Sequence, residues 1–206
     1  MNVLLINGSP HANGCTATAL GAVARTLEGE GIETTTVHVG HREIRGCIGC
    51  YRCAQLGRCV FDDVVGETAP LLERADGVVV GSPVHYAGAA GTLTAFLDRL
   101  FFSTRFSKRM KVGAAVVSAR RAGTTATFDQ LNKYFTISEM PIVSSRYWNM
   151  VHGAVADDVL KDEEGMQTMR VLGRNMAFLI RAIAAERELH GLPVEETERM
   201  HTNFIR

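Results

Sequence analysis

Short apolar or β-branched runs alternate with amphipathic helical segments along most of the chain. The runs have the length of strands and lie at residues 3–7, 34–39, 78–80, 112–117 and 141–143. The segments between them place apolar residues three and four positions apart, which is the period of a helix that buries one face. Strands that alternate with helices in this way form a parallel sheet with helices on both faces, so the sequence predicts an α/β fold.

Five such strands fit the flavodoxin-like order 2-1-3-4-5 better than a six-stranded dinucleotide-binding sheet. The third strand is expected to be broken by Gly81-Ser82-Pro83. No repeat or linker-like stretch divides the chain, and we therefore predict one domain over residues 1–189. Within this domain, residues 40–61 form a cysteine-rich insertion. After the domain, residues 190–206 form a polar C-terminal tail.

Charge and hydropathy exclude two classes of partner. Twenty-two Lys and Arg residues balance 22 Asp and Glu residues, so no strong overall field attracts nucleic acid or anionic lipid. No apolar run approaches the roughly 18 residues that span a bilayer, and the N-terminus lacks the pattern of a signal peptide. We expect no nucleic acid partner, no membrane partner and a cytoplasmic location.

The loop after the first strand is the first candidate site, because ligands of such sheets bind beyond the carboxyl ends of the strands. It reads Gly8-Ser9-Pro10-His11-Ala12-Asn13-Gly14-Cys15-Thr16 and precedes a helix. Free amides and the positive end of that helix would receive a phosphomonoester without Lys or Arg. A plain turn with an N-cap is the alternative reading of the same residues.

Two further loops follow strands and are expected at the same edge of the sheet. The second loop is Ser82-Pro83-Val84-His85-Tyr86-Ala87-Gly88, and the third is Ser118-Ala119-Arg120-Arg121-Ala122-Gly123-Thr124. The second combines a rigid ring, an imidazole and a phenol, which suit the edge of a flat aromatic ligand, and His85 is a candidate acid or base. The two arginines of the third could balance a reduced ligand's charge or hold a nicotinamide cofactor's phosphate, or form an exposed basic pair.

Four of the five cysteines crowd into 13 residues, which in a reducing compartment indicates metal or redox chemistry rather than disulfides. They are Cys47, Cys50, Cys53 and Cys59. Four local thiolates can serve one [4Fe–4S] cluster; zinc is weaker because its sites usually pair cysteines across a longer loop, and metal-free thiols are the remaining alternative. Cys15 stands apart at a helix start, either as a reactive thiol or as a packing residue.

Taken together, these motifs resemble the NADPH-dependent FMN reductase group, and especially its iron–sulfur flavoprotein branch. The resemblance rests on the first loop, the cysteine spacing, the Ser82–Tyr86 stretch, Phe96-Leu97-Asp98-Arg99, and the Ala119–Gly123 loop. It implies FMN, with its phosphate at Ser9, Asn13, Gly14 and Thr16 and its ring beside Pro83, Val84, His85 and Tyr86. The wider candidate cofactor site adds His11, Cys15, Gly88, Ser118, Arg120, Arg121 and Gly123.

Three positions depart from the family pattern. His11 stands where Arg is frequent, and Cys15 stands where Asn is frequent. The phosphate therefore loses a fixed charge and an amide, so FMN is expected to bind less tightly or to respond to protonation of His11. His85 replaces a common Tyr and makes the flavin edge more polar.

The sequence and the resemblance together predict an FMN-dependent NAD(P)H oxidoreductase. Hydride would pass from the nicotinamide to the flavin and then to a quinone, a nitro- or azo-aromatic, free flavin or a protein acceptor. The alternative is an electron carrier in which a [4Fe–4S] cluster on the four cysteines accepts electrons from ferredoxin. The resemblance also implies a homodimer or homotetramer, for which Tyr147-Trp148-Asn149 is a candidate interface.

Overall fold

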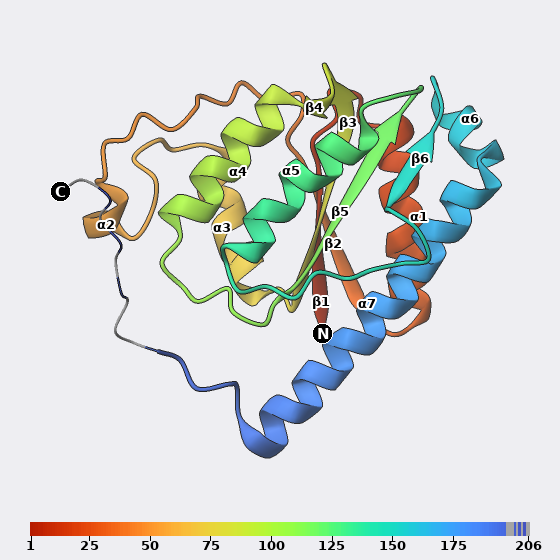
Figure 1. Cartoon of the computed structure of the whole chain (residues 1–206). Coiled ribbons are helices and arrows are strands. Elements are labelled where there is room, and N and C mark those ends of the chain that lie inside the picture. The colour runs from red at the N-terminus through yellow and green to blue at the C-terminus, as the bar shows by residue number, and fades with distance from the viewer. Residues whose placement is uncertain (197–199, 201, 203, 205–206) are drawn as a thin grey trace.

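A parallel sheet of five strands runs through the centre of the computed structural model, which describes residues 1–196, 200, 202 and 204 (Figure 1). In spatial order its strands are β2 (Glu33–His38), β1 (Asn2–Asn7), β3 (Gly77–His85), β5 (Val112–Ala119) and β6 (Met150–His152). A two-residue strand, β4 (Gly88–Ala89), pairs with the end of β3 in the opposite direction. Apart from β4, the order is the predicted 2-1-3-4-5.

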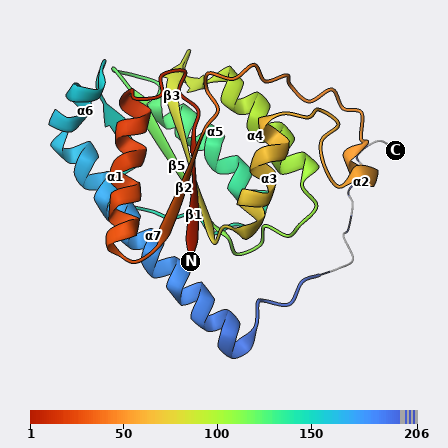
Figure 2. The same ribbon diagram turned by 180° about the vertical axis from the view of Figure 1, so that it is seen from behind.

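Helices cover both faces of the sheet, as the alternating pattern predicts (Figures 1 and 2). One face carries α1 (Cys15–Gly29), α6 (Ala156–Lys161) and α7 (Glu163–His190). The other carries α3 (Val64–Arg74), α4 (Gly91–Ser103) and α5 (Thr124–Thr136). The cysteine-rich segment 40–61 contains one short helix, α2 (Cys53–Leu56).

The central strands are buried on both sides, which explains their continuous apolar runs. In β1, Val3 and Leu5 pack into the core beneath α1 and α7, whereas Leu4 and Ile6 pack into the core beneath α3, α4 and α5. Successive side chains of a strand point to opposite faces, so a strand between two helical layers needs apolar residues at every position. This arrangement fixes the register and brings the carboxyl ends of the strands to one edge.

The prediction of a fifth strand at 141–143 is wrong. Residues around Ile142 form only an isolated bridge to Gly113, at the beginning of β5, whereas the last strand of the sheet is β6, which pairs with Val117–Ala119. Pro141 has no N–H to donate and so cannot complete a ladder there. The sequence Met150-Val151-His152 lacks a β-branched run, so its composition does not mark it as a strand.

The expected break at Gly81-Ser82-Pro83 is also wrong, because β3 continues through these residues to His85. Pro83 pairs with Ser118 of β5, while pairing with β1 ends at Gly81. Beyond Gly81 the strand has lost its neighbour on the β1 side, and proline is tolerated where a strand has an open edge. The third strand is therefore longer than predicted and extends beyond the end of its neighbour β1.

Two further observations concern the whole chain. The polar tail predicted at 190–206 lies partly outside the described residues. Among the described residues, none of the helices combines the length and the apolar character needed to cross a bilayer.

Candidate functional site

A cleft of about 910 Å³ lies at the carboxyl ends of β1, β3, β5 and β6. Its size falls within the range of about 300–1,000 Å³ that is typical of cofactor and small-molecule sites. All three predicted loops contribute to its lining, together with a fourth loop that follows β6. The lining residues are Ser9–Thr16, Pro83–His85, Ser118–Arg120 and Gly153–Asp157.

The first loop presents the start of α1 to the cleft. Gly14 is the N-cap residue and has no side chain to accept hydrogen bonds from the first amides, and the first turn contains no acidic residue. Helix amides without an internal acceptor carry partial positive charge and attract anions. The start of α1 therefore has the chemistry of a phosphate site, and His11 and Asn13 lie exposed beside it.

Buried hydroxyl groups hold this loop in place. The side-chain oxygens of Thr16 and Ser118 lie 2.8 Å apart, which joins the first turn of α1 to the end of β5. The Ser9 hydroxyl accepts from the His11 amide at 3.1 Å, and the side-chain oxygen of Asn7 accepts from the Ser9 amide at 3.0 Å. Ser9 and Thr16 are thus predicted site residues whose contacts also shape the loop.

Two residues at and just beyond the end of β2 support the first loop, and sequence reasoning missed them. A side chain at Gly40 would lie 2.1 Å from the carbonyl oxygen of Ser9, so only glycine permits this approach. The same carbonyl lies 2.7 Å from Nε2 of His38. Neither residue belongs to a recognisable motif, and only the parallel pairing of β1 with β2 brings them to Ser9.

The second loop is a tight hairpin between β3 and β4, with Tyr86 and Ala87 at its tip. Both tip residues have positive φ values, +50° and +57°, which a two-residue hairpin turn requires but which L side chains rarely adopt. Pro83, Val84 and His85 line the cleft, whereas Tyr86 is fully exposed and lies outside the lining. The structure thus brings His85 to the cleft and turns Tyr86 to solvent.

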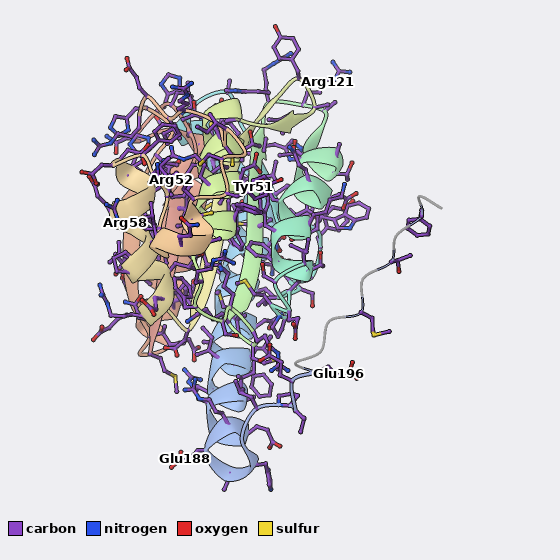
Figure 3. The ribbon with its side chains drawn as sticks, turned by 90° about the vertical axis from the view of Figure 1, so that its left-hand side faces the viewer. Tyr51, Arg52, Arg58, Arg121, Glu188 and Glu196 are labelled. Atoms are coloured by element: carbon purple, nitrogen blue, oxygen red, sulfur yellow. The ribbon has the colours of Figure 1, made fainter. Side chains whose placement is uncertain are left out.

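In the third loop, too, only some of the candidate residues line the cleft. Arg120 lines the cleft beside Ser118, but Arg121 does not; Figure 3 shows Arg121 next to the β3–β4 hairpin. Gly123 has φ +93°, and a side chain there would lie 2.8 Å from Cα of Ala87. Gly123 therefore acts by letting the hairpin pack against the start of α5. Gly88 sits in the hairpin itself, outside the cleft lining.

The fourth loop, residues 153–157, was not predicted, because the strand before it was misplaced. Its turn is held by Asp158, whose carboxylate accepts from the amides of Ala154 at 3.0 Å and Val155 at 3.2 Å. These two hydrogen bonds lower the pKa of Asp158. Asp158 therefore stabilises the start of α6, whose first turn also contains Asp157.

Cys15 packs at the base of the cleft. Its thiol donates to the carbonyl oxygen of Gly153 at 3.5 Å and packs against the core under α1. Burial raises the pKa of Cys15, which is the opposite of the acidification expected for a reactive thiol at a helix start. This environment favours the packing role over the reactive one.

A separate small pocket lies under the cysteine-rich segment, and all four clustered cysteines border it together with Arg99. Cys47 and Cys50 are exposed, Cys59 is half-buried and Cys53 is buried. Figure 3 looks onto this side of the molecule, where Tyr51, Arg52 and Arg58 are labelled. The pocket shares no lining residue with the cleft.

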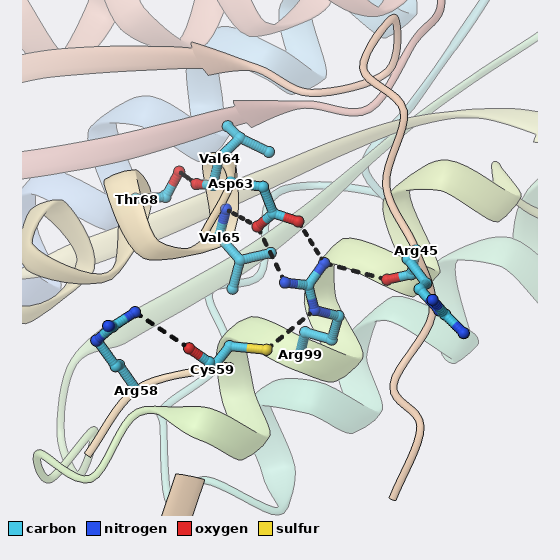
Figure 4. Close-up of polar contacts among 8 residues, drawn as sticks. All are labelled: Arg45, Arg58, Cys59, Asp63, Val64, Val65, Thr68 and Arg99. Atoms are coloured by element: carbon cyan, nitrogen blue, oxygen red, sulfur yellow. Dashed lines mark hydrogen bonds and ion pairs between the residues drawn. The ribbon is translucent and has the colours of Figure 1, made fainter. Parts of the chain in front are cut away.

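Arg99 of α4 borders this pocket and is only 1% exposed. Figure 4 shows its polar contacts. Arg99 forms a two-pronged ion pair with Asp63, with nitrogen–oxygen distances of 2.7 and 3.0 Å. Its Nε also donates to the sulfur of Cys59 at 3.3 Å. Burial disfavours the charged guanidinium, but the contacts with Asp63 and Cys59 outweigh it and raise the pKa of Arg99.

The pocket is bordered by four thiols, which is the ligand type of iron–sulfur clusters, but these thiols do not form a metal-ion site. In the described part of the chain, no three His, Cys, Asp or Glu side chains are gathered closely enough to hold one ion. A cubane cluster instead binds each thiolate to a different iron, so its ligands surround a larger volume. The structure shows four cysteines around one pocket and a buried cation beside one sulfur.

Comparison with known proteins places the chain in a family. The family model described as NADPH-dependent FMN reductase matches residues 1–155. An iron–sulfur flavoprotein of Methanocaldococcus jannaschii is 32% identical over 191 residues, covering 89% of this chain and 99% of that protein. An iron–sulfur flavoprotein of Methanosarcina thermophila is 28% identical over 192 residues, covering 91% and 100%.

Solved structures agree on the fold. RosB, determined with a bound 8-demethyl-8-formylriboflavin-5′-phosphate, superposes with a TM-score of 0.72 at 14% identity, covering 100% of this chain and 92% of that one. A flavodoxin from the domain Archaea gives a TM-score of 0.61 at 15% identity, covering 88% and 99%. The protein is therefore a flavodoxin-like, flavin-dependent oxidoreductase of the NADPH-dependent FMN reductase family, in the group of the iron–sulfur flavoproteins.

Proposed function

We propose that the protein binds FMN in the cleft and uses it to oxidise NAD(P)H and reduce a second substrate. The observation that carries this proposal is the convergence of four strand-end loops on one cleft of about 910 Å³. The acceptor is a quinone, a nitro- or azo-aromatic, free flavin or a protein. Bound FMN supplies the hydride and electron chemistry.

The chain's own residues would bind and orient the two ends of the cofactor. The free amides at the start of α1, with the side chains of Asn13 and Thr16, would hold the phosphate. Pro83, Val84 and His85 would line one edge of the ring. These groups lie on different strand ends, so the sheet itself fixes the distance between the phosphate site and the ring site.

Charge at the rim would select the second ligand. Arg120 is exposed and lines the cleft, so its guanidinium is available to a phosphate of NADH or NADPH or to a reduced ring. His85, exposed at the end of β3, is the candidate proton donor or acceptor for a substrate stacked on the ring. Cys15 and Ser118 complete the base of the cleft.

Two measurements test this proposal. Titration of FMN into flavin-free protein should quench FMN fluorescence with saturation at one equivalent, and protein that takes up no FMN at micromolar excess would contradict the proposal. Steady-state rates with NADPH or NADH and menadione should then give parallel double-reciprocal lines, because both substrates use the same open ring face in turn. Intersecting lines would exclude this alternating use.

A second candidate function is electron transfer through a [4Fe–4S] cluster on Cys47, Cys50, Cys53 and Cys59. The border that all four share around one pocket supports it, as do the relatives named iron–sulfur flavoproteins. A bound cluster supplies one-electron chemistry, with ferredoxin as the expected donor. Anaerobic purification separates the candidates: brown protein with about four irons and sulfides per chain and slow NAD(P)H oxidation favours the carrier. Yellow, iron-free protein with fast oxidation favours the reductase.

The proposed assembly is a cytoplasmic homodimer or homotetramer. Tyr147 and Trp148 are 53% and 51% exposed and contact each other edge to face, while Asn149 beside them is buried. Tyr and Trp are enriched at protein–protein interfaces relative to the rest of the surface. Sedimentation analysis of the Trp148→Ala variant tests this, since a wild-type sedimentation profile would exclude this pair from the interface.

A further inference from the structure

Arg99 is a buried cation for which the proposed flavin chemistry has no use. Its guanidinium contacts three partners besides the core: the carboxylate of Asp63, the sulfur of Cys59 and the carbonyl oxygen of Arg45, the last at 3.1 Å (Figure 4). The ring of Phe61 lies 4.9 Å from its central carbon. Every nitrogen of the guanidinium donates a hydrogen bond, so its orientation is fixed on all sides.

These partners flank the cysteine segment at both ends. Arg45 lies two positions before Cys47, Cys59 is the last of the four cysteines, and Asp63 is the N-cap residue of α3. Between them the chain has only the four-residue helix α2. One side chain of α4 therefore sets the separation between the beginning and the end of the segment that carries all four thiols.

The contact of Arg99 with Cys59 affects the charge on the sulfur as well as its position. A hydrogen bond from a charged donor to a sulfur stabilises negative charge on that sulfur. Hydrogen bonds to the cysteine sulfurs of an iron–sulfur cluster, and positive charge beside it, favour the more negative, reduced form and so raise the reduction potential. The Asp63 carboxylate balances the charge of Arg99, but it binds Nη1 and Nη2, whereas Nε donates to the sulfur of Cys59.

We propose that Arg99 is the positioning residue of an iron–sulfur site: it holds Cys59 toward the shared pocket and stabilises the reduced cluster. The proposal rests on the second candidate function, because it requires a cluster on the four cysteines. It assigns no contact with FMN to Arg99, which lies outside the lining of the cleft. Loss of the guanidinium should therefore affect iron and leave flavin binding unchanged.

A matched pair of arginines allows a sharp test. Arg58 is exposed, and its Nη1 lies 3.5 Å from the backbone carbonyl oxygen of Cys59, so it touches the same residue but not its sulfur. The variants are Arg99→Lys, Arg99→Gln and the control Arg58→Gln. Each full-length protein is reconstituted anaerobically with ferrous iron and sulfide, and iron, sulfide and FMN are counted per chain. The potential of the cluster is then measured by dithionite titration, in which each cluster takes up one electron.

The expected results separate positioning from folding. Arg58→Gln should match the wild type in all readouts. Arg99→Gln should lose at least half of its iron and retain its FMN. Arg99→Lys retains the charge near Asp63 but not the planar donor to sulfur, so it should load iron and titrate at a more negative potential than the wild type.

Three results would overturn the proposal. Wild-type iron content and potential in both Arg99 variants would exclude the role of Arg99 while leaving the cluster in place. A wild-type protein that takes up no iron would exclude the cluster and the role of Arg99 together. Loss of FMN along with iron in Arg99→Lys would show that Arg99 acts through the fold as a whole and not on the cysteine site.

Discussion

The hydroxyl groups of Thr16 and Ser118 meet at 2.8 Å although the two residues are 102 positions apart in the sequence. Both are buried, and together they connect the first turn of α1 to the end of β5 beneath the cleft. A buried hydroxyl that loses its partner costs about 1–3 kcal/mol. This hydrogen bond therefore links the proposed phosphate site to the loop that carries Arg120.

Thr16→Val should weaken both the fold and FMN binding, because it keeps the shape of the side chain but leaves the Ser118 hydroxyl without its partner. We expect the free energy of unfolding to fall by about 1–3 kcal/mol and the FMN dissociation constant to rise about tenfold. Urea unfolding and fluorescence titration measure these effects. The control is Thr26→Val, since Thr26 lies on the same helix far from the cleft and donates to the Ala22 carbonyl oxygen. Equal FMN affinity in the two variants would contradict the role of Thr16.

Gly123→Ala should loosen the hairpin that lines the cleft. The added methyl group would lie 2.8 Å from Ala87 and 2.9 Å from Val84, in a backbone conformation with φ +93° that disfavours side chains. Gly31→Ala is the matched control, because Gly31 has φ +77° but open space around it. Conformational strain alone costs about 1–2 kcal/mol. We expect Gly123→Ala to exceed the control in thermal destabilisation and to lower FMN affinity, which Gly31→Ala should not do.

Cys15 should react slowly with alkylating reagents at neutral pH. Burial raises its pKa, so little thiolate is present, whereas Cys47 and Cys50 are exposed. Mass spectrometry after timed iodoacetamide treatment of metal-free protein should find these two modified well before Cys15. Saturating FMN should slow modification of Cys15 further, since that residue lines the cleft. Alkylation of Cys15 at the rate of Cys47 would disprove the assignment of Cys15 as a packing residue.

Acid should weaken the fourth loop through Asp158. Its pKa in the folded protein is lowered by hydrogen bonds from Ala154 and Val155, so its contribution to stability is complete above the unfolded value of about 4 and is lost as pH falls through the lower, folded value. The melting temperature, measured from pH 7 to pH 3, should therefore fall more steeply in the wild type than in Asp158→Asn.

Asp157→Asn is the control for this experiment, because the Asp157 carboxylate makes no hydrogen bond within the described part of the chain. Its stability should follow the wild-type pH profile. The role of Asp158 is refuted when the two substitutions flatten the profile to the same extent.

Much of the fold could be predicted because its signals are local. Alternating apolar runs and helical faces determine a parallel sheet, and the carboxyl-end rule then brings three separate loops to one cleft. The helix α3 (Val64–Arg74), for example, is preceded by its own N-cap residue, Asp63. What failed depended on contacts between distant segments. The strand at Met150–His152 is specified by pairing with Val117–Ala119, and not by its own composition.

The candidate site was predictable to the level of loops and not of side chains. Sequence could not separate Arg120 from its neighbour Arg121, nor His85 from Tyr86, because the turn conformation decides which of two adjacent residues faces the cleft. The fourth loop was missed along with its strand. Arg99 was noted only as part of a family motif; its contacts arise from α4, the cysteine segment and α3 meeting in space.

β3 continues four residues past its last pairing with β1, so the wall of the cleft that β3 forms extends beyond the end of β1. The upper part of this wall is the β3–β4 hairpin, whose tip residues pair with no strand of the parallel sheet. Residues added or removed at that tip would lengthen or shorten the hairpin above the cleft without shifting the register of the central strands. The height of this wall can therefore change with the length of the hairpin, while the register of the scaffold stays constant.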